Sequence, residues 1–397
     1  MRRLCLLSTL IAAALTGCSS SASHPTQTPK AEVVKQWNDA RSGVLISLAG
    51  DQYHNGAFDK SRQTLDEALK LSPENEPAHI LSAKLFIEAG QLEAAERELA
   101  LARQLDPTDA QADYLSGVVY QRWQQPERAL EFYQHACDKS PAELAYVMAK
   151  AETLVAMGRR ADALAMLQER VAYFEHSGVI RDEVGLLLIQ EKRYDEAVEM
   201  LRRATILAND DQTIREHLAM ALFYDKQYQD SADILATFLQ DEQYAQRADL
   251  LATLGECQLQ IGRAGDAAQN LQMAAALLPG SAGVWLSLAK ADLQIGNLRS
   301  ADIALNHSVA HDSANSQAWL LMGYLRLRQS RNADALDAFC RASQRDPKDT
   351  LSLCMVGLAL DKLGRKAEAV ACFQKALHID PKDEMAAQLM ARLDLHE

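Results

Sequence analysis

Residues 316–349, SQAWLLMGYLRLRQSRNADALDAFCRASQRDPKD, decide the fold of this chain. A first apolar helix carries the small Gly323, and after a polar turn Ala335 and Phe339 lie on one face of a second helix. Pro347 ends that helix because proline has no N–H to donate and clashes with the preceding turn. A helix–turn–helix unit of 34 residues cannot bury its own apolar faces, so this stretch predicts a copy of itself on each side.

Copies of this unit recur through most of the sequence. One period later, Gly357 and Phe373 repeat the spacing of Gly323 and Phe339. The step is 34 residues except after residue 245, where two residues are inserted. We therefore expect ten repeats, which span residues 42–75, 76–109, 110–143, 144–177, 178–211, 212–245, 248–281, 282–315, 316–349 and 350–383.

The unit is similar to the tetratricopeptide repeat (TPR), whose marks are Trp, Leu-Gly, Tyr, Ala, Phe and Pro at set positions. Trp319 fits these marks, whereas Met322 and Arg326 depart from them. The resemblance implies an all-α fold. It would be a right-handed TPR superhelix, or α-solenoid, of about ten helix–turn–helix repeats over residues 42–383, with an N-terminal extension and a C-terminal capping helix.

Two of the repeats are less regular than the others. Arg170 in repeat 144–177 and Phe238 in repeat 212–245 stand where most repeats have alanine. Because a phenyl ring is much larger than a methyl group, we expect Phe238 to push neighbouring helices apart and to change the superhelical curvature around residues 238–250.

Apolar residues beyond both ends of the array predict caps, because the first and last repeats each expose a face. Val33, Val34 and Trp37 are expected to form an N-terminal helical cap within residues 31–41. The spacing of apolar residues over 384–397 predicts a C-terminal capping helix.

Residues 1–17 have the architecture of a secretory signal peptide, with two arginines, an apolar run and then small residues. Residues 15–18, LTGC, resemble the lipobox of bacterial lipoproteins. This resemblance implies cleavage before Cys18, acylation of that cysteine and, because Ser19 follows it, transfer to the outer membrane with the repeats facing the periplasm. Residues 18–30 would then be the lipidated cysteine and a disordered tether, since they offer no large apolar side chain. An ordinary signal peptide with a chance cysteine is the alternative.

Composition limits the function. The chain of 397 residues has a formal net charge of -13, which argues against nucleic acid or an anionic membrane as the ligand of the repeats, because both attract clustered Lys and Arg. The sequence contains no Gly-rich phosphate loop, no H-E-x-x-H and no G-x-S-x-G. We therefore expect neither an enzyme nor a bound cofactor.

Histidines and cysteines offer few metal ligands. His307 and His311 lie four residues apart on one expected helix, a spacing that two ligands could use, but no third ligand is evident and no metal is expected. The cysteines after Cys18 favour the role of small core hydrophobes, with a disulfide among the last three as the alternative. They are Cys137, Cys257, Cys340, Cys354 and Cys372.

In the TPR family the first helix of each repeat lines a concave groove, through its second, fifth, ninth, twelfth and thirteenth residues. Aromatic residues there suit the anchoring of a helical or extended protein segment, and arginines suit a carboxylate of that segment. For each apolar residue the alternative is packing between helices. Transferred to this sequence, the positions predict a protein-binding groove lined by Tyr53, Ile80, Ile87, Tyr114, Val118, Arg122, Met148, Leu186, Met220, Phe223, Tyr224, Leu286, Lys290, Leu320, Tyr324, Leu327 and Arg328.

The combination of lipobox, short tether and TPR array resembles the lipoproteins of tight-adherence (Flp) pilus loci, the TadD type, and the pilotins of type IV pilus secretins. It implies an outer-membrane-anchored periplasmic scaffold that binds pilus or secretin components and assists their assembly; self-association stays open. One alternative is an adaptor that recruits peptidoglycan hydrolases. Another is an enzyme subunit or carbohydrate-binding module, although Trp285 and Trp319 occupy a position that packs inside TPR units.

Overall fold

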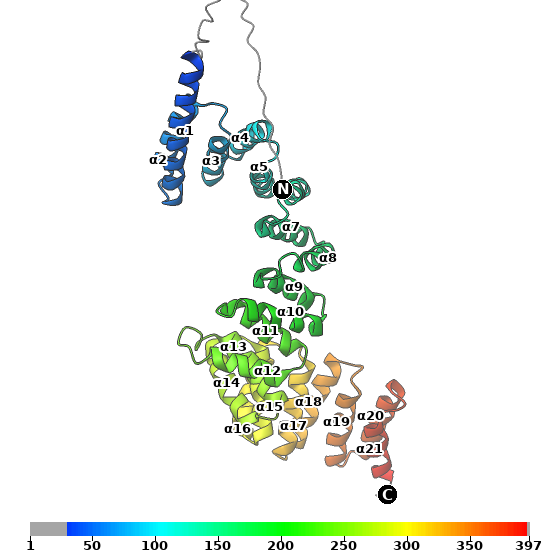
Figure 1. The fold of residues 1–397 in the computed structure, drawn as a ribbon. Helices are drawn as coiled ribbons and strands as arrows, with labels where there is room; N and C mark the ends of the chain where they lie inside the picture. Colours follow the sequence, from blue (N-terminus) through cyan, green and yellow to red (C-terminus); the bar gives the residue numbers. More distant parts are fainter. Residues whose placement is uncertain (1–29, 395–397) are drawn as a thin grey trace, which may run out of the picture. The chain divides into compact units, whose positions relative to one another are not determined.

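The structure, a computed structural model, describes residues 30–394. The expected signal peptide, Cys18 and the tether up to residue 29 therefore lie outside the described residues. Within 30–394 the chain consists of helices joined by turns, without a β-strand (Figure 1). It divides into two compact units, of which unit 1 ends at Arg159 and unit 2 begins at Arg160. The division falls inside the expected repeat 144–177.

Unit 1 is built from consecutive antiparallel helices. They are α1 (Lys30–His54), α2 (Phe58–Leu71), α3 (Glu76–Glu88), α4 (Leu92–Leu105), α5 (Ala110–Arg122), α6 (Pro126–Lys139) and α7 (Leu144–Ala156). Unit 2 continues the same pattern with α8 (Arg160–Val171), α9 (Gly178–Gln190), α10 (Tyr194–Leu207), α11 (Gln212–Tyr224), α12 (Tyr228–Phe238), α13 (Ala248–Gln260), α14 (Ala264–Leu277), α15 (Ala282–Ile295), α16 (Leu298–His311), α17 (Ser316–Arg328), α18 (Asn332–Arg345), α19 (Thr350–Lys362), α20 (Lys366–Ile379) and α21 (Glu384–Asp394).

Side-chain caps begin the first helix of many pairs. Asp211, for example, accepts hydrogen bonds from the backbone N–H groups of Thr213 and Ile214. Such a cap satisfies N–H groups that have no partner inside the helix, and it fixes where the helix begins. The same geometry occurs at Asn75, Asp109, Ser281, Asn315 and Asp349.

A glycine facing a large side chain holds the two helices of several pairs close together. In α17 a Cβ atom at Gly323 would clash with the ring of Phe339 on α18, and Gly357 meets Phe373 in the same way. Both rings are fully buried. The small and the large residue that recur at this spacing are therefore the residues through which the two helices of a pair contact each other.

The fourth residue of several repeats ties its helix to the preceding loop. Trp285 donates its indole N–H to the carbonyl of Pro279 at 2.8 Å, and Trp319 donates to that of Ser313 at 3.0 Å. His79 contacts the carbonyl of Pro73 in the same register, 2.9 Å from its Nε2. The two tryptophans thus serve the repeat structure, as their position in the pattern predicts.

The irregular repeats have short second helices. The helix α12 ends at Phe238 itself, whereas α10 continues three residues past Ala204, which holds the equivalent position. Phe238 is buried, and its ring meets that of Tyr244 edge-on at 5.3 Å. The segment that follows, 239–247, contains the inserted residues. The expected change in curvature at 238–250 stays a prediction.

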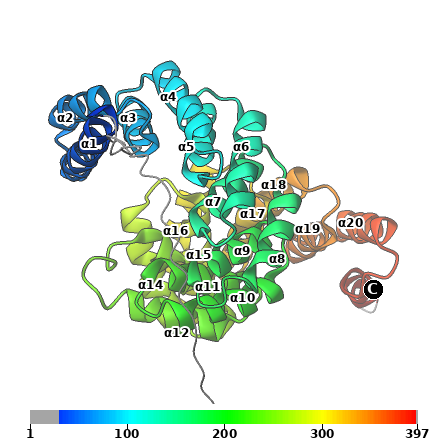
Figure 2. The same ribbon diagram turned by 45° about the horizontal axis from the view of Figure 1, so that its top comes forward.

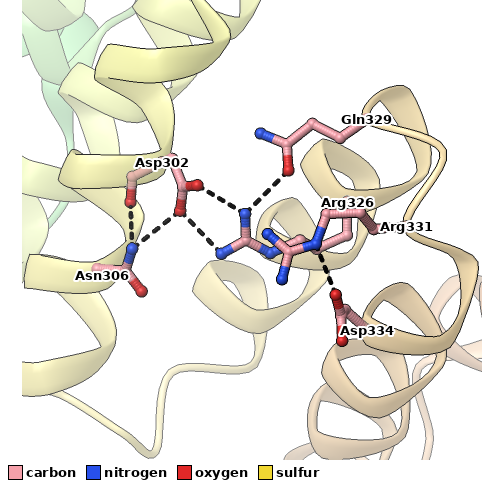
Figure 3. A network of polar contacts seen from close by, with 6 residues as sticks. All are labelled: Asp302, Asn306, Arg326, Gln329, Arg331 and Asp334. Atoms are coloured by element: carbon pink, nitrogen blue, oxygen red, sulfur yellow. Dashed lines mark hydrogen bonds and ion pairs between the residues drawn. The ribbon is translucent and has the colours of Figure 1, made fainter.

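A polar link joins adjacent repeats in unit 2 (Figure 3). Arg326 on α17 donates from Nη1 to Asp302 Oδ2 at 2.6 Å and from Nη2 to Oδ1 at 2.8 Å. Gln329 also accepts from Arg326, and Asn306 donates to Asp302. The Arg326 and Asp302 side chains are only 12% and 27% exposed. The arginine that departs from the family pattern therefore connects α17 to α16.

The two ends of the array differ. At the C-terminal end α21 packs on α20 and buries Ala386 and Leu393, so it covers the last repeat. At the N-terminal end residues 31–41 are helical, as expected, but the expected packing of their apolar side chains on the first repeat is not found. The helix α1 runs unbroken from Lys30 to His54, and Trp37 is exposed rather than packed on the first repeat.

No disulfide joins the cysteines within residues 30–394, and Cys137, Cys257 and Cys354 are buried. Burial raises the pKa of Cys354 to about 11, so this thiol stays protonated and acts as a small apolar side chain. The ring of His307 stacks on Trp285 at 4.3 Å, with His311 beside it at 6.4 Å. This pair of histidines is part of the packing around a loop-holding tryptophan.

Candidate protein-binding groove

A cavity of about 130 Å³ crosses three consecutive repeats of unit 2 on the side of their first helices. These helices are α11, α13 and α15, and the start of α12 closes one side. Because each repeat contributes side chains, a segment bound here would contact all three repeats at once. The lining residues are Phe223, Tyr228, Glu256, Leu259, Gln260, Ser287 and Lys290.

The floor of this cavity carries both signs of charge. Ser287 donates its hydroxyl to Glu256 Oε1 at 3.0 Å, which orients the carboxylate. Lys290, one turn along α15, is half-buried and supplies an ammonium donor. Leu259 adds apolar surface beside these groups. The floor can therefore bind a backbone amide, a cation and a carbonyl oxygen of one segment.

Aromatic rings lie next to the cavity. Phe223 on α11 lines it and meets Tyr228 edge-on, with 5.9 Å between ring centroids. Tyr224 stacks on Tyr194 of the preceding pair at 5.4 Å. Met220 and Tyr224 are 40% and 44% exposed. Rings held by their neighbours and still open to solvent are suited to anchoring a partner, since little side-chain freedom is lost on binding.

Unit 1 has a cavity of different chemistry at another place in its repeats. A cavity of about 450 Å³ lies between α3 and the start of α5. Burial lowers the pKa of Lys84 in this cavity. Its charged residues are mainly acidic, so the two units present different chemistry. The lining residues are Glu76, Pro77, Ile80, Leu81, Lys84, Asp106, Asp109 and Gln111.

Glu76 in this cavity makes unit 1 more stable in acid. Burial and then a hydrogen bond with the Asp109 carboxyl raise the pKa of Glu76 to about 7. The folded chain therefore binds the proton more tightly than the unfolded chain. The resulting stabilisation is complete below the ordinary pKa of 4.5 and is lost as the pH rises through about 7. We expect Glu76→Gln to match the wild-type melting temperature near pH 5 and to exceed it near pH 8.

Thermal denaturation followed by circular dichroism across this pH range measures the effect. Glu74→Gln is the matched control, because Glu74 is an exposed carboxylate two residues away. If the two variants differ from wild type in the same way at every pH, the assignment to Glu76 is wrong.

The structure brings together only part of the predicted groove. Met220, Phe223 and Tyr224 form one surface on α11, and Lys290 lies in the adjoining cavity. Tyr324 is separately exposed on α17. The other accessible or half-buried predicted residues are Tyr53, Tyr114, Val118, Met148, Leu186, Leu320 and Leu327.

Three predicted groove residues are core residues instead. Ile80, Ile87 and Leu286 are 4%, 4% and 6% exposed. The two isoleucines pack in the core of unit 1, and Leu286 packs in the core of unit 2. Each of these side chains is buried against its neighbours rather than open to solvent, so they offer a partner little surface. Ile80 reaches only the floor of the unit 1 cavity.

The two predicted groove arginines bind their own chain. Arg122 donates to the carbonyl of Ile87 at 2.7 Å, and Arg328 donates to that of Leu293 at 3.1 Å. In each case the acceptor lies near the end of the first helix of the preceding repeat, where carbonyls lack helical partners. Both arginines are exposed, and each guanidinium has further N–H donors, so the expectation that they hold a partner's carboxylate stays a prediction.

The sequence-based list also missed residues of the unit 2 cavity. Glu256, Leu259 and Gln260 hold the ninth, twelfth and thirteenth places of repeat 248–281, so the same transfer of positions would have found them. Ser287 and Tyr228 lie outside those places, and only the packing of the helices brings them in.

Within residues 30–394, no helix is long and apolar enough to cross a bilayer. No group of three or more His, Cys, Asp or Glu side chains in the same part of the chain could hold a metal ion.

Comparison with known proteins identifies the repeats. Family models of the tetratricopeptide repeat match residues 52–117 and 148–212. The model of the C-terminal domain of cilia and flagella-associated protein 70 matches residues 226–396. No curated protein matches the chain.

Solved structures with the same kind of helical repeat include a crystal structure of MamA. It is 22% identical, covers 42% of this chain and 95% of its own, and gives a TM-score of 0.40. The crystal structure of the APC/C hetero-tetramer Cut9-Hcn1 is 13% identical, covers 91% of this chain and 98% of its own, and gives a TM-score of 0.46.

Proposed function

Because the chain carries tetratricopeptide repeats, we propose that it is a scaffold that captures a segment of a protein partner at the groove of α11, α13 and α15. TPR domains typically bind proteins, and TPR proteins are in general scaffolds rather than enzymes. The observation that carries the proposal is a cavity lined by Phe223, Glu256 and Lys290, with exposed side chains next to Phe223 on the same side of α11. These side chains are Met220 and Tyr224.

The partner segment has a definable chemistry. An apolar or aromatic side chain would pack on Tyr224 and Met220, and polar backbone or a charged side chain would meet Glu256 and Lys290. An extended segment or a helix turn both offer this combination.

We further propose that the scaffold works at the outer membrane, facing the periplasm, and assists assembly of a pilus or secretion system. The support is the sequence LTGC at residues 15–18 after an apolar run, which fits acylation of Cys18. Anchoring the groove at a membrane raises the effective concentration of a membrane-associated partner there. Recruitment of peptidoglycan hydrolases by the same groove is the alternative.

Removing the exposed groove side chains should weaken capture without unfolding the protein. Met220→Ala with Tyr224→Ala truncates two anchors at the groove, and we expect at least a tenfold loss of affinity, since hot-spot residues contribute about 2 kcal/mol or more each. Met273→Ala is the matched control, because Met273 is 51% exposed on the second helix of its repeat.

The measurement is affinity capture with the membrane-anchored protein from cross-linked envelopes, followed by titration of the recovered partner. Pilus or secretin components support the first assignment, and cell-wall hydrolases support the alternative. If the double variant binds as tightly as wild type and Met273→Ala does not, the groove lies on the other face of the repeats.

A further inference from the structure

The outer face of α1 carries an apolar stripe, which we call the α1 stripe and which consists of Val33, Trp37, Val44 and Leu48. These side chains are 56%, 68%, 71% and 47% exposed. Their spacings of four, seven and four residues place them on one side of a helix. Soluble proteins rarely expose contiguous apolar surface, and where they do it commonly marks an interaction site.

Folding of unit 1 uses the opposite side of α1. Ser42 and Ala49 are fully buried, and Ser42 donates its hydroxyl to the carbonyl of Ala68 on α2 at 3.0 Å. Ala49 packs with Leu65 and other residues of the first two pairs. Figure 2 shows α1 beside α2 at the beginning of unit 1. The α1 stripe therefore has no role in the packing of the first repeat.

Trp37 differs from the other tryptophans of the chain. Trp285 and Trp319 bond their indole N–H groups to loop carbonyls, and Trp123 is half-buried against its neighbours. Trp37 has the highest exposure of the four. An indole ring with one apolar face and one polar N–H is well suited to the boundary between lipid and water.

The position of α1 in the chain limits what can cover the stripe. If Cys18 is acylated as proposed, only residues 19–29 separate the lipid from Lys30, and that length of chain reaches at most roughly 40 Å. The stripe itself extends about 22 Å along the helix axis. The membrane surface therefore lies within reach of the whole stripe.

The charge of α1 does not oppose this contact, although the whole chain has a formal net charge of -13. The helix α1 has three basic and three acidic residues. Helical spacing places two of the basic ones, Lys30 and Arg41, along one border of the stripe. Basic residues that border an apolar face are typical of helices that lie on a membrane.

We propose that the α1 stripe lies on the lipid surface to which Cys18 is attached and that this contact sets the orientation of unit 1 at the membrane. The inference rests on the proposed lipid anchor. A second copy of α1 fits the stripe less well, because a two-stranded coiled-coil seam through Val33 and Trp37 would place Ser47 and Asp51 at buried positions. Asp51 lies on the same side of the helix but beyond Leu48, so a lipid contact that ends at Leu48 leaves its carboxylate in water.

Quenching of Trp37 by lipid tests the contact. The full chain, purified from bacterial membranes, is reconstituted into vesicles of phosphatidylethanolamine and phosphatidylglycerol with and without bromine on the acyl chains. The emission of Trp37 is obtained as wild type minus Trp37→Phe. We expect brominated lipid to quench most of the Trp37 emission. The control is the emission of Trp123, obtained as wild type minus Trp123→Phe, and we expect brominated lipid to leave it unchanged.

A second variant makes the outcome specific to the stripe. Val44→Asp should restore the Trp37 emission in brominated vesicles, whereas Ile206→Asp, at a residue 78% exposed on α10, should not. Unquenched Trp37 emission in brominated vesicles overturns the contact. Unquenched emission whose wavelength shifts with protein density instead shows that a second copy covers the stripe.

Fractionation of the Cys18→Ala chain separates this inference from the anchor on which it rests. If the variant leaves the membrane and Trp37 of the wild type is still not quenched, the anchor stands and the α1 contact is wrong. If the variant stays at the membrane, the anchor at Cys18 fails, and quenching of Trp37 in that variant decides whether the α1 stripe holds the chain there. If the wild-type chain does not associate with vesicles, the anchor and the contact both fail.

Discussion

Arg326→Met is expected to lower the free energy of unfolding of unit 2 by about 2–4 kcal/mol. The substitution leaves the Asp302 carboxylate mostly buried without the two hydrogen bonds that the guanidinium donates, at 2.6 and 2.8 Å. Removing the donor of a carboxylate that is kept from water lowers the free energy of unfolding far more than removing the donor of an exposed carboxylate. Urea denaturation of the full chain, followed by circular dichroism, measures the change.

A nearby exposed pair provides the comparison. Arg331 and Asp334 form an ion pair in the next turn, with both side chains about half exposed (Figure 3). Arg331→Met should therefore cost less than about 1 kcal/mol. In a double-mutant cycle with Asp302→Asn, the coupling to Arg326→Met should reach about 1–3 kcal/mol. Equal losses from Arg326→Met and Arg331→Met would show that the link between α16 and α17 is not special.

The same pair predicts a dependence on pH. The hydrogen bonds from Arg326 lower the pKa of Asp302 below its ordinary value of 3.8. A lowered carboxyl pKa contributes stability that is present above the unfolded-state pKa and is lost as the pH falls through the folded-state pKa. The difference in stability between wild type and Arg326→Met should therefore shrink in acid. Glu76 contributes in the opposite direction, because its pKa is raised.

The periodic part of this fold could be predicted from the sequence because the residues that hold the two helices of a pair together lie within one repeat. Gly323 and Phe339 lie close in the chain, and the contact between them is the one that their spacing implies. The C-terminal capping helix follows for the same reason, since its apolar residues need only the preceding pair of helices to pack on.

Contacts that cross a whole period could not be predicted. The acceptor of Arg122 is Ile87 O, 35 residues upstream, and nothing near either residue in the chain indicates it. Whether Ile80 faces solvent depends on how closely the next repeat approaches. The division between Arg159 and Arg160 is a further example, because it falls between the two helices of repeat 144–177, which the repeat pattern treats as one pair.

Gly323→Val is expected to lower the free energy of unfolding of unit 2 by about 3 kcal/mol. The ring of Phe339 fills the space that any Cβ atom at residue 323 would occupy, and that ring is fully buried, so it has no free space to move into. The two helices of the pair must separate, which weakens the contact between α17 and α18 along its length. Denaturation in urea again measures the loss.

Two further variants decide whether the clash is the cause. Gly283→Val is the matched control, because no atom lies within 4 Å of a Cβ atom there, and its effect should stay within about 0.5 kcal/mol. Phe339→Ala alone should cost about 3–5 kcal/mol through the cavity it leaves. Combined with Gly323→Val it should cost less than the sum of the two, since the valine then fills part of that cavity. Additive losses would mean that the glycine is required for its backbone and not for the space it leaves to the ring.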